Sequence, residues 1–474
     1  MPASWRNSLE FSYHEALMST FHIINFGCRA SQADGAAIKK QLILAGLKEA
    51  NPEESQITVI NTCTVTAAAD AEARQVIRRL QRENPAGRIL VTGCYAQRAS
   101  DEIARLPGVA WVVGNSHKHT VAEILLRESA RPAPAKNSPA PAELRPGNGN
   151  PLPIFKPSKP PARILVGEIG DTFHFAPVSA DDRTRPTLKV QDGCNARCAF
   201  CVIPHVRGES RSLRPGKVIE QVRELEKEGY QEIALSGINL GSYGRDLEPR
   251  LNFLALLERI LAETKVPRLR ISSIEPMDVS HEFIQLVARE PRLAKHFHVP
   301  LQSGSNRILR LMNRRYWTTQ YAERMLAIHE QVPNCGLGAD VMVGFPGESE
   351  ADHAESMRFI ESLPFTYLHI FPYSARPGTP AAGSSHPVDG RRIHERGREM
   401  RSLITAKRQE FLRAQVGQRL SVLTLHKEEE GMRFSLSSNY LKVCLPSPNT
   451  VPNSLLEVRV GGVDGDQLVG YQAF

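Results

Sequence analysis

Six of the eight cysteines fall into two sets of three whose spacing suits iron–sulfur clusters. The close triplet has C-x3-C-x2-C spacing and consists of Cys194, Cys198 and Cys201. The spread triplet consists of single cysteines that each follow a short apolar run, namely Cys28, Cys63 and Cys94. Thiolates hold such clusters, which normally take four ligands. Three ligands leave one iron with an open position, so we predict two reactive clusters rather than electron-transfer centres.

Other uses of the cysteines remain open. A zinc site normally needs four ligands, and His205 is a candidate for the fourth ligand of the close triplet. Eight cysteines could also form disulfides. However, the first 20 residues carry charges and no apolar core, so we expect no secretory signal and a reducing, cytoplasmic location. Cys335 and Cys444 have no partner at ligand spacing, and we expect them in the core.

The bulk composition is that of a globular protein with several domains. The chain has 474 residues, of which 41% are hydrophobic and 23% charged. Lysine and arginine exceed aspartate and glutamate by 8, and the pI is near 9.1. This excess permits nucleic-acid binding without proving it. No apolar run is long enough to predict a membrane span.

Strands and helices alternate after an N-terminal extension at 1–20. Within 21–129, the strand-like runs FHIINFG, ITVINT and RILVTG are separated by amphipathic helices, which predicts a parallel α/β domain. Each cysteine of the spread triplet comes at the carboxyl end of one such strand. Ligands bind at that edge of an open parallel sheet, so we expect the three to converge. Three buried core cysteines are the alternative.

Three further regions follow the first domain. Residues 130–163 hold ten of the 33 prolines and predict an extended linker. Residues 180–415 contain six strand candidates and end in a long basic helix at about 388–415, which predicts a partial or full βα barrel with the close triplet after its first strand. Residues 416–474 read as short strands with turns, hence a small β-barrel. The overall class is therefore α/β with a C-terminal β-barrel.

The close triplet, with Phe200 before its last cysteine, resembles the radical S-adenosylmethionine superfamily. The segments NTCTVT, TGCYAQ, LSGINLGSYGRD, SSIEP, HVPLQSGSNRILRLMNRRY, ADVMVGFPGE and FPYSARPGTPAA are similar to those of methylthiotransferases. The tail with SSNYLKV more weakly resembles the TRAM module, a small RNA-binding barrel. Together these segments run from Cys28 to about residue 385 and beyond.

The resemblance implies two 4Fe-4S clusters and S-adenosylmethionine as cofactors. The close triplet would hold the cluster whose open iron binds S-adenosylmethionine, and the spread triplet an auxiliary cluster that carries the sulfur to be donated. One S-adenosylmethionine would methylate that sulfur, and a second would yield a radical that abstracts hydrogen from the target carbon. The implied partners are the tRNA anticodon loop and an electron donor such as flavodoxin or ferredoxin.

Other residues are candidates for binding the cofactor, each with a structural role as the alternative. They lie at the ends of predicted barrel strands and comprise Ser236, Gly237, Glu275, Gln302, Ser303 and Asp340. Small residues permit close approach of a cofactor, a carboxylate could bind a ribose or ammonium group, and amides could donate hydrogen bonds. We expect His298 and His369 to be core histidines. The arginines of the second helix and of the 388–415 helix could face either solvent or RNA.

The methylthiotransferases that the chain resembles comprise three classes with different targets. FGCRASQADG is closest to the class that acts on N6-threonylcarbamoyladenosine 37 of tRNA, and GCYAQ and NLGSYGRDL also fit it. Arg29, Ala30 and Ser31 and the long linker depart from that pattern. Isopentenyladenosine 37 of tRNA and a ribosomal-protein aspartate are the alternatives. A non-catalytic RNA-binding redox sensor is a hypothesis of another kind, but a sensor needs no cofactor pocket.

Overall fold

The computed structural model describes residues 20–129, 161–170 and 184–472, so the N-terminal extension and most of the predicted linker lie outside the described ranges. The chain divides into two compact units. The first comprises residues up to 26 together with 38–62 and 70–168, and the second comprises 27–37, 63–69 and 169–474. No helix within the described ranges is both long and apolar enough to cross a membrane.

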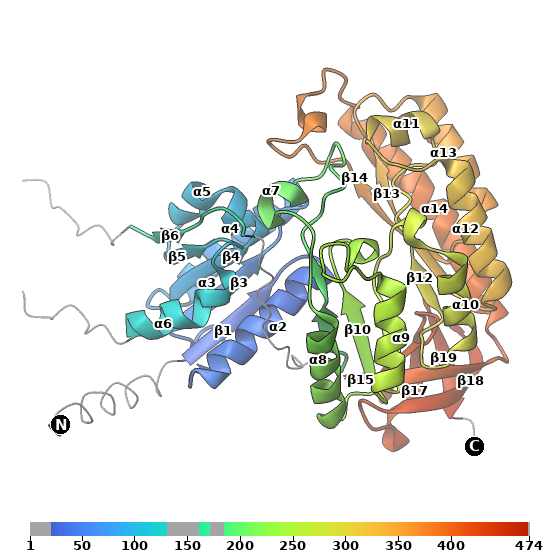
Figure 1. Ribbon diagram of the computed structural model, residues 1–474, viewed down its shortest axis with the longest axis horizontal. Helices are drawn as coiled ribbons and strands as arrows, with labels where there is room; N and C mark the ends of the chain where they lie inside the picture. Colours follow the sequence, from blue (N-terminus) through green and yellow to red (C-terminus); the bar gives the residue numbers. More distant parts are fainter. Residues whose placement is uncertain (1–19, 130–160, 171–183, 473–474) are drawn as a thin grey trace, which may run out of the picture. The chain divides into compact units, whose positions relative to one another are not determined.

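The first unit contains a parallel sheet of six strands, as Figure 1 shows in blue, cyan and, for the last strand, green. The strand order is β2-β1-β3-β4-β5-β6. The strands are β1 (Thr20–Asn25), β2 (Lys48–Glu49), β3 (Ile57–Thr62), β4 (Arg88–Gly93), β5 (Val109–Val113) and β6 (Arg163–Leu165). The order of the first five matches a doubly wound sheet of the flavodoxin type, whose ligands bind at the switch point between β1 and β3.

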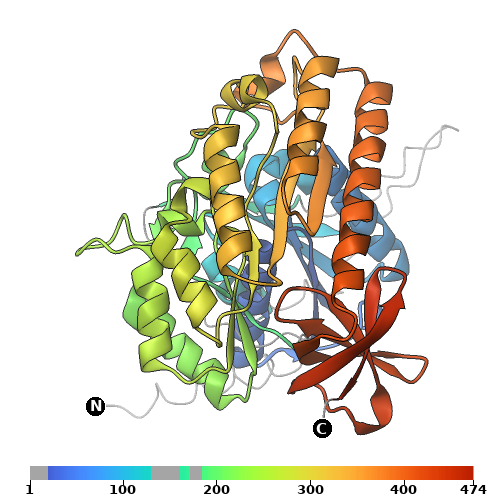
Figure 2. The ribbon, with the colours of Figure 1, turned by 90° about the vertical axis from the view of Figure 1, so that its right-hand side faces the viewer.

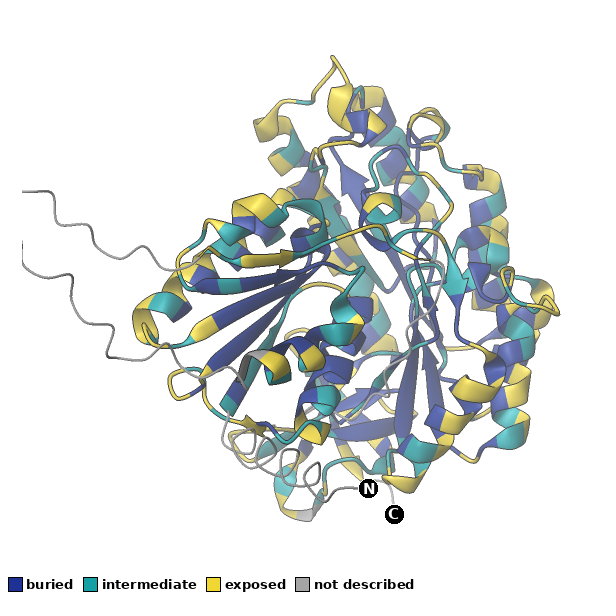
Figure 3. Ribbon diagram, turned by 60° about the vertical axis from the view of Figure 1, so that its left-hand side comes forward, coloured by how far each residue is buried: buried dark blue, intermediate teal, exposed yellow. Residues whose placement is uncertain are grey.

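Helices cover both faces of this sheet, which explains why its strands are nearly continuous apolar runs. One core joins the sheet to α2 (Arg29–Leu44) and α6 (Val121–Ser129) through residues such as Leu42 and Leu125. The other core joins it to α3 (Ala67–Glu83), α4 (Cys94–Arg98) and α5 (Ser100–Ala104). Figure 3 shows the inner strands as buried.

The sixth strand corrects the prediction of a domain at 21–129 followed by a linker at 130–163. β6 begins at Arg163 and pairs with β5 in parallel, at Trp111↔Arg163 and Val113↔Leu165. The sheet therefore resumes after the proline-rich segment. A strand of three residues with two exposed positions has no apolar pattern that the sequence could reveal.

The second unit contains the six predicted barrel strands in chain order. One sheet has the order β11-β10-β7, and the other has the order β12-β13-β14. Isolated parallel bridges from Leu269 to Leu293 and from Ser273 to His298 connect β11 with β12. The strands are β7 (Thr187–Lys189), β10 (Glu232–Ser236), β11 (Arg268–Ile271), β12 (His296–His298), β13 (Gly336–Val343) and β14 (Tyr367–Pro372). The result is a partial parallel barrel, as the alternation predicted.

Helices pack against one face of these strands. They are α8 (Pro215–Lys227), α9 (Phe253–Glu263), α10 (His281–Arg289), α12 (Thr318–Gln331) and α13 (Glu350–Ser362). One hydrophobic core contains the strand residues Leu235, Leu269 and Val341 together with helix residues such as Ile260 and Met325. The opposite face of the strands carries polar side chains and is therefore where binding residues of the barrel can gather.

A closed barrel of five strands ends the chain, as the sequence predicted. It follows α14 (Gly390–Ala414) and has the order β15-β16-β17-β19-β18. Figure 2 shows the barrel in red at the end of α14. Its strands are β15 (Arg419–Glu429), β16 (Met432–Ser437), β17 (Lys442–Pro446), β18 (Leu455–Asp464) and β19 (Gln467–Gln472). Leu412 of α14 belongs to its core, so the helix and the barrel are packed together.

Candidate cluster and cofactor site

The close triplet lies in the loop that follows the first barrel strand. The loop begins after β8 (Gln191–Asp192) and leads into the short helix α7 (Ile203–Arg207). Gly193 precedes the first cysteine with φ 74°, and a Cβ atom there would collide with the carbonyl oxygen of Glu209. Only glycine suits this close turn, so Gly193 fixes the direction in which the triplet loop leaves the strand.

Nitrogen donors surround two of the three sulfur atoms. The Ala196 amide lies 3.4 Å from Cys194 Sγ, and Asn239 Nδ2 lies 4.0 Å from the same sulfur. Arg314 Nη1 donates to Cys198 Sγ over 3.3 Å. Donors placed in this way stabilise thiolates, and hydrogen bonds to sulfur tune the potential of iron–sulfur clusters.

When no metal ion is bound, burial opposes the effect of these donors because it disfavours the charged thiolate. It raises the pKa of Cys194, and it raises the pKa of Cys201 to about 12. Without a cation, the Cys194 and Cys201 thiols therefore stay protonated, whereas a bound metal deprotonates its thiol ligands outright. Three half-buried thiols, two of them with nitrogen donors at the sulfur, fit a cluster with three protein ligands.

A cavity of about 210 Å³ adjoins the close triplet. Polar and charged side chains line it, including Cys198, Asn239, Glu275, Arg314 and Tyr316. Cys198 and Glu275, both predicted as site residues from the sequence, thus line the same cavity. The cavity offers a carboxylate, an amide and a guanidinium beside a thiol, which is a donor set for a ligand with both charged and polar groups.

Arg314 is a site residue that the sequence reasoning missed. Its guanidinium pairs with the Glu275 carboxylate and is 6% exposed, so it is held in place rather than solvated. In the sequence, the segment LMNRRY carries a family resemblance and no further signal. Two adjacent arginines carry no periodic signal that tells the buried one from its neighbour, so the sequence could not single out Arg314.

Ser236 and Gly237 end β10 beside the cavity without lining it. The Ser236 carbonyl accepts a hydrogen bond from the Val190 amide, and the serine is buried. A Cβ atom at Gly237 would lie 2.9 Å from Gln191 Oε1, which accepts a hydrogen bond from the Asn239 amide. These small residues therefore let protein groups approach closely and position Asn239, which does line the cavity.

Gln302, Ser303 and Phe200 occupy three different environments. Gln302 is buried with φ 65°, and its Oε1 atom has no hydrogen-bond partner within the described part of the chain. Ser303 lies 3.4 Å from the Ser356 hydroxyl and accepts from the Ser305 amide, so it stabilises its own loop. Phe200 packs against a small apolar cluster that includes Met312. Of the three, only Gln302 presents an unused polar atom.

Asp340 lies with two histidines rather than in the cavity beside Cys198. It contacts His298 and His369, which come from the strands on either side of β13. His298 is buried as predicted, but the His369 side chain is 60% exposed, so the prediction of a core histidine is wrong for His369. The candidate cofactor residues therefore divide between two places on the barrel.

The cysteines of the spread triplet follow three neighbouring strands, as the alternation predicted. Asn25 of β1 pairs with Asn61 of β3, and Thr62 of β3 pairs with Gly93 of β4. Cys63 and Cys94 come directly after the last two of these residues, and Cys28 follows the end of β1. Each of the three thus follows one of three adjacent strand ends.

Close contacts surround the side chains of two of these cysteines, Cys63 and Cys94. Gly27 has φ 91°, and a Cβ atom there would collide with the Cys63 side chain, so the chain before Cys28 lies directly against Cys63. Asn115 Nδ2 lies 3.5 Å from Cys94 Sγ. All eight cysteines are in the described ranges, and none forms a disulfide there. Cys335 and Cys444 are buried, as expected.

Comparisons with known proteins agree with this arrangement. The model of the radical SAM superfamily matches residues 188–360, and the model of the uncharacterized protein family UPF0004 matches residues 20–114. The chain is 35% identical to the threonylcarbamoyladenosine tRNA methylthiotransferase MtaB of Bacillus subtilis, over 94% of each chain. It is 37% identical to the protein of that name from Aquifex aeolicus, over 88% of this chain and 94% of the relative.

Two more matches extend the comparison. The chain is 30% identical to the tRNA-2-methylthio-N(6)-dimethylallyladenosine synthase of Pelotomaculum thermopropionicum, over 89% of this chain and 90% of the relative. The structure of the radical S-adenosylmethionine methyltransferase TsrM from Kitasatospora setae, with cobalamin and a [4Fe-4S] cluster bound, aligns with a TM-score of 0.51. It covers 77% of this chain and 74% of that chain at 14% identity, a likeness of fold alone.

These relatives define the class. The chain belongs to the radical S-adenosylmethionine methylthiotransferase family and is an enzyme of that class. The expected cofactors, iron–sulfur clusters and S-adenosylmethionine, are those of the class. Family membership sets aside the hypothesis of a non-catalytic redox sensor.

Proposed function

We propose that this protein adds a methylthio group to C2 of N6-threonylcarbamoyladenosine at position 37 of tRNA. The observation that carries the proposal is the pairing of the close triplet with a cavity lined by Asn239, Glu275 and Arg314 on a radical SAM barrel. The choice of substrate rests on relatives, since the first four are named for threonylcarbamoyladenosine. The fifth relative is named for dimethylallyladenosine, which supports the same chemistry on another modified adenosine.

Residues of the barrel would bind the first cluster and the cofactor. Cys194, Cys198 and Cys201 would ligate a 4Fe-4S cluster, and Arg314 would donate to one of the ligating sulfurs. Glu275, 29% exposed on the cavity wall, would accept hydrogen bonds from the ammonium or ribose of S-adenosylmethionine. When bound, these groups supply the radical chemistry that activates an unreactive C–H bond.

The loops after β1, β3 and β4 would bind the second cluster. Cys28, Cys63 and Cys94 follow strand ends around the β1/β3 switch point, where sheets of this order bind their ligands. Asn115 would donate to the Cys94 sulfur. We assign this auxiliary cluster to the loops that follow these three strands, and the radical chemistry to residues 180–415.

RNA binding is assigned to the C-terminal part of the chain. The 25 residues of α14 include exposed arginines such as Arg391, Arg398 and Arg401, and the helix packs into the adjoining β-barrel of 416–474. Arginines on one helix beside a small barrel suit the phosphates of an anticodon stem-loop. A flavodoxin- or ferredoxin-type donor in the cytoplasm would supply electrons.

Mass spectrometry of tRNA nucleosides tests the proposal. A strain that lacks the gene should lose 2-methylthio-N6-threonylcarbamoyladenosine, and the intact gene should restore it. The Cys198→Ala form should not restore it, whereas Cys444→Ala, in the C-terminal barrel, should. Loss of the isopentenyl form instead would move the substrate to the second tRNA class. Unchanged nucleosides would contradict a tRNA substrate and direct attention to the ribosomal-protein aspartate.

A further inference from the structure

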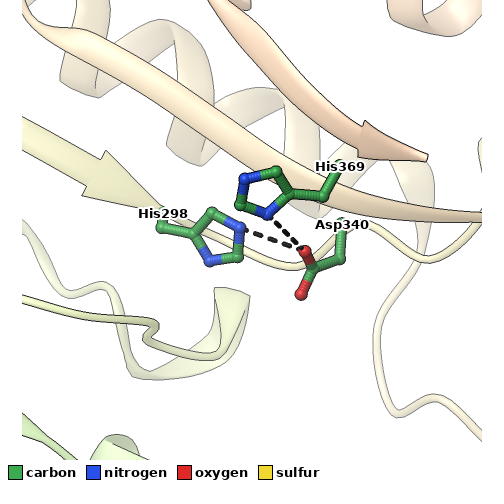
Figure 4. A group of neighbouring side chains, drawn as sticks. All are labelled: His298, Asp340 and His369. Atoms are coloured by element: carbon green, nitrogen blue, oxygen red, sulfur yellow. Dashed lines mark hydrogen bonds and ion pairs between the residues drawn. The ribbon is translucent and has the colours of Figure 1, made fainter. Parts of the chain in front are cut away.

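Three side chains with metal-ligating atoms meet on neighbouring strands of the barrel. They are His298 at the end of β12, Asp340 in β13 and His369 in β14, and Figure 4 shows them facing one another. Asp340 and His369 are register partners, and His298 pairs with Gly338, two residues before Asp340. All three therefore lie on one face of the sheet.

That face is the one opposite the helices. Strand residues of the alternate positions, Phe297, Leu337 and Val341, belong to the hydrophobic core that the helices share. Two histidines and a carboxylate are therefore grouped where the barrel does not need them for packing. None of the three lines the cavity beside Cys198.

The distances between the three groups suit a single metal ion. His298 Nε2 and His369 Nδ1 each lie 3.2 Å from Asp340 Oδ1, and all three ligand atoms lie within 4.8 Å of one another. A tetrahedral zinc ion with bonds of about 2.0–2.1 Å holds neighbouring nitrogen and oxygen ligands about 3.3 Å apart. The side chains would need little movement to ligate such an ion.

His298 is oriented as a ligating histidine would be. Its Nδ1 atom lies 2.7 Å from the Ser273 hydroxyl, an outer contact of the kind that fixes the ring of a metal ligand. Its Nε2 atom is buried and faces Asp340, yet it has no aligned hydrogen bond within the described ranges. When Nδ1–H donates to Ser273, the Nε2 lone pair faces a carboxylate oxygen, and a cation between them would remove that repulsion.

The site is open to a ligand. The Asp340 side chain is 28% exposed and that of His369 is 60% exposed, which leaves a route for an ion to enter.

We propose that His298, Asp340 and His369 bind one divalent transition-metal ion, with Zn²⁺ as the best fit, apart from both cysteine triplets. Two imidazoles and a carboxylate are ligands that zinc takes readily. Three protein ligands leave at least one coordination position for water or substrate. The competing reading is an aspartate held by two histidines with no ion.

The open position has a consequence that rests on the proposed function. A threonylcarbamoyl group carries a carboxylate and a hydroxyl, whereas an isopentenyl group carries no oxygen. A zinc ion at this site would bind the carboxylate oxygen of the first and could not bind the second. The metal would then contribute to the choice between the two modified adenosines.

Zinc content of the cluster-loaded full chain tests the site. Loaded clusters occupy the two cysteine triplets, so added Zn²⁺ should bind at about one ion per chain after gel filtration, with iron unchanged. His369→Gln and Asp340→Asn should each weaken zinc binding at least about 100-fold, and Ser273→Ala about 10- to 100-fold. His329→Gln, an exposed histidine of α12, is the matched control. No zinc in the native chain, or equal zinc in all variants, would overturn the proposal.

Zinc-edge X-ray absorption of the native chain gives a second test that needs no variant. Nitrogen and oxygen ligands alone support the site, and sulfur ligands overturn it. Affinity for anticodon stem-loops then tests the substrate step: zinc should tighten binding of the threonylcarbamoyl form at least about 10-fold and leave the isopentenyl form unchanged. Equal effects would contradict that step. Zinc binding needs no tRNA, so its failure and a failure of the nucleoside assay are separate results.

Discussion

Glu275 and Arg314 form an ion pair on the wall of the cavity that also contains Cys198. The same guanidinium lies 3.3 Å from Cys198 Sγ, so one buried cation joins a carboxylate to a sulfur of the close triplet. Substitution of Arg314 should therefore affect both the cluster of the close triplet and the binding of S-adenosylmethionine.

Replacement of Arg314 should make the cluster of the close triplet harder to reduce. Arg314→Leu removes a cationic donor from a ligating sulfur, and hydrogen bonds to sulfur help to set the reduction potential. We expect the potential to fall by at least about 60 mV, a tenfold change for a one-electron couple. Redox titration followed by electron paramagnetic resonance measures this. Arg310→Leu, an exposed change on α11 (Asn306–Leu311), should leave the potential unchanged.

Loss of one triplet cysteine should remove one cluster only. The native chain should carry about eight iron atoms, because each of two clusters holds four. Cys198→Ala should carry about four and should not cleave S-adenosylmethionine. Iron analysis and detection of 5′-deoxyadenosine give the two readouts. Cys444→Ala, buried in the C-terminal barrel, should keep both properties; cleavage by the Cys198 variant would refute the assignment of the triplet.

Gly27 should be needed for cluster binding by the spread triplet because it lies against Cys63, and not only because its φ is positive. Gly27→Ala adds a Cβ atom that would collide with Cys63. Less auxiliary cluster should therefore bind, and the iron content should fall toward half. Gly431 has a similar φ, 73°, but a Cβ atom there would meet nothing within 4 Å. Gly431→Ala should therefore keep its iron. Equal losses would attribute the effect to backbone strain alone.

Glu232 should stabilise the barrel in a pH-dependent way. Its buried carboxylate contacts Arg270 at 2.7 Å, Arg185 at 3.1 Å and Arg268 at 3.3 Å. Burial would raise the pKa of Glu232, but these arginines hold it well below its ordinary value. The stabilisation is therefore complete well above the pKa of the unfolded chain, about 4.3, and is lost progressively as the pH falls through and below that value.

Glu232→Gln tests this relationship. Removal of one partner of a buried ion pair leaves the arginines uncompensated, and we expect a loss of about 3–5 kcal/mol at pH 7. Urea titrations at pH 7 and at about pH 3.5, below the unfolded pKa, should show a smaller difference between the two proteins at the lower pH. Glu220→Gln, an exposed residue of α8, should cost under about 1 kcal/mol. A difference that does not vary with pH would contradict the electrostatic origin.

The sequence predicts element order well because each element has its own period. Alternating apolar runs placed the strands before Cys28, Cys63 and Cys94, and the same alternation predicted the six barrel strands. Side-chain partners depend instead on which strands are neighbours and in which register. The pairing of Asp340 with His369 follows from the register of β13 and β14, and the Glu275–Arg314 pair from loop packing. Neither relationship has a local pattern.

The return of the chain to its first sheet changes what the proline-rich region does. β5 precedes the proline-rich region and β6 follows it, and the two strands pair at Trp111 and Arg163. The connection from this sheet to the barrel strands therefore begins only after β6. A protease cut between residues 130 and 160 should leave two fragments that stay associated under native conditions.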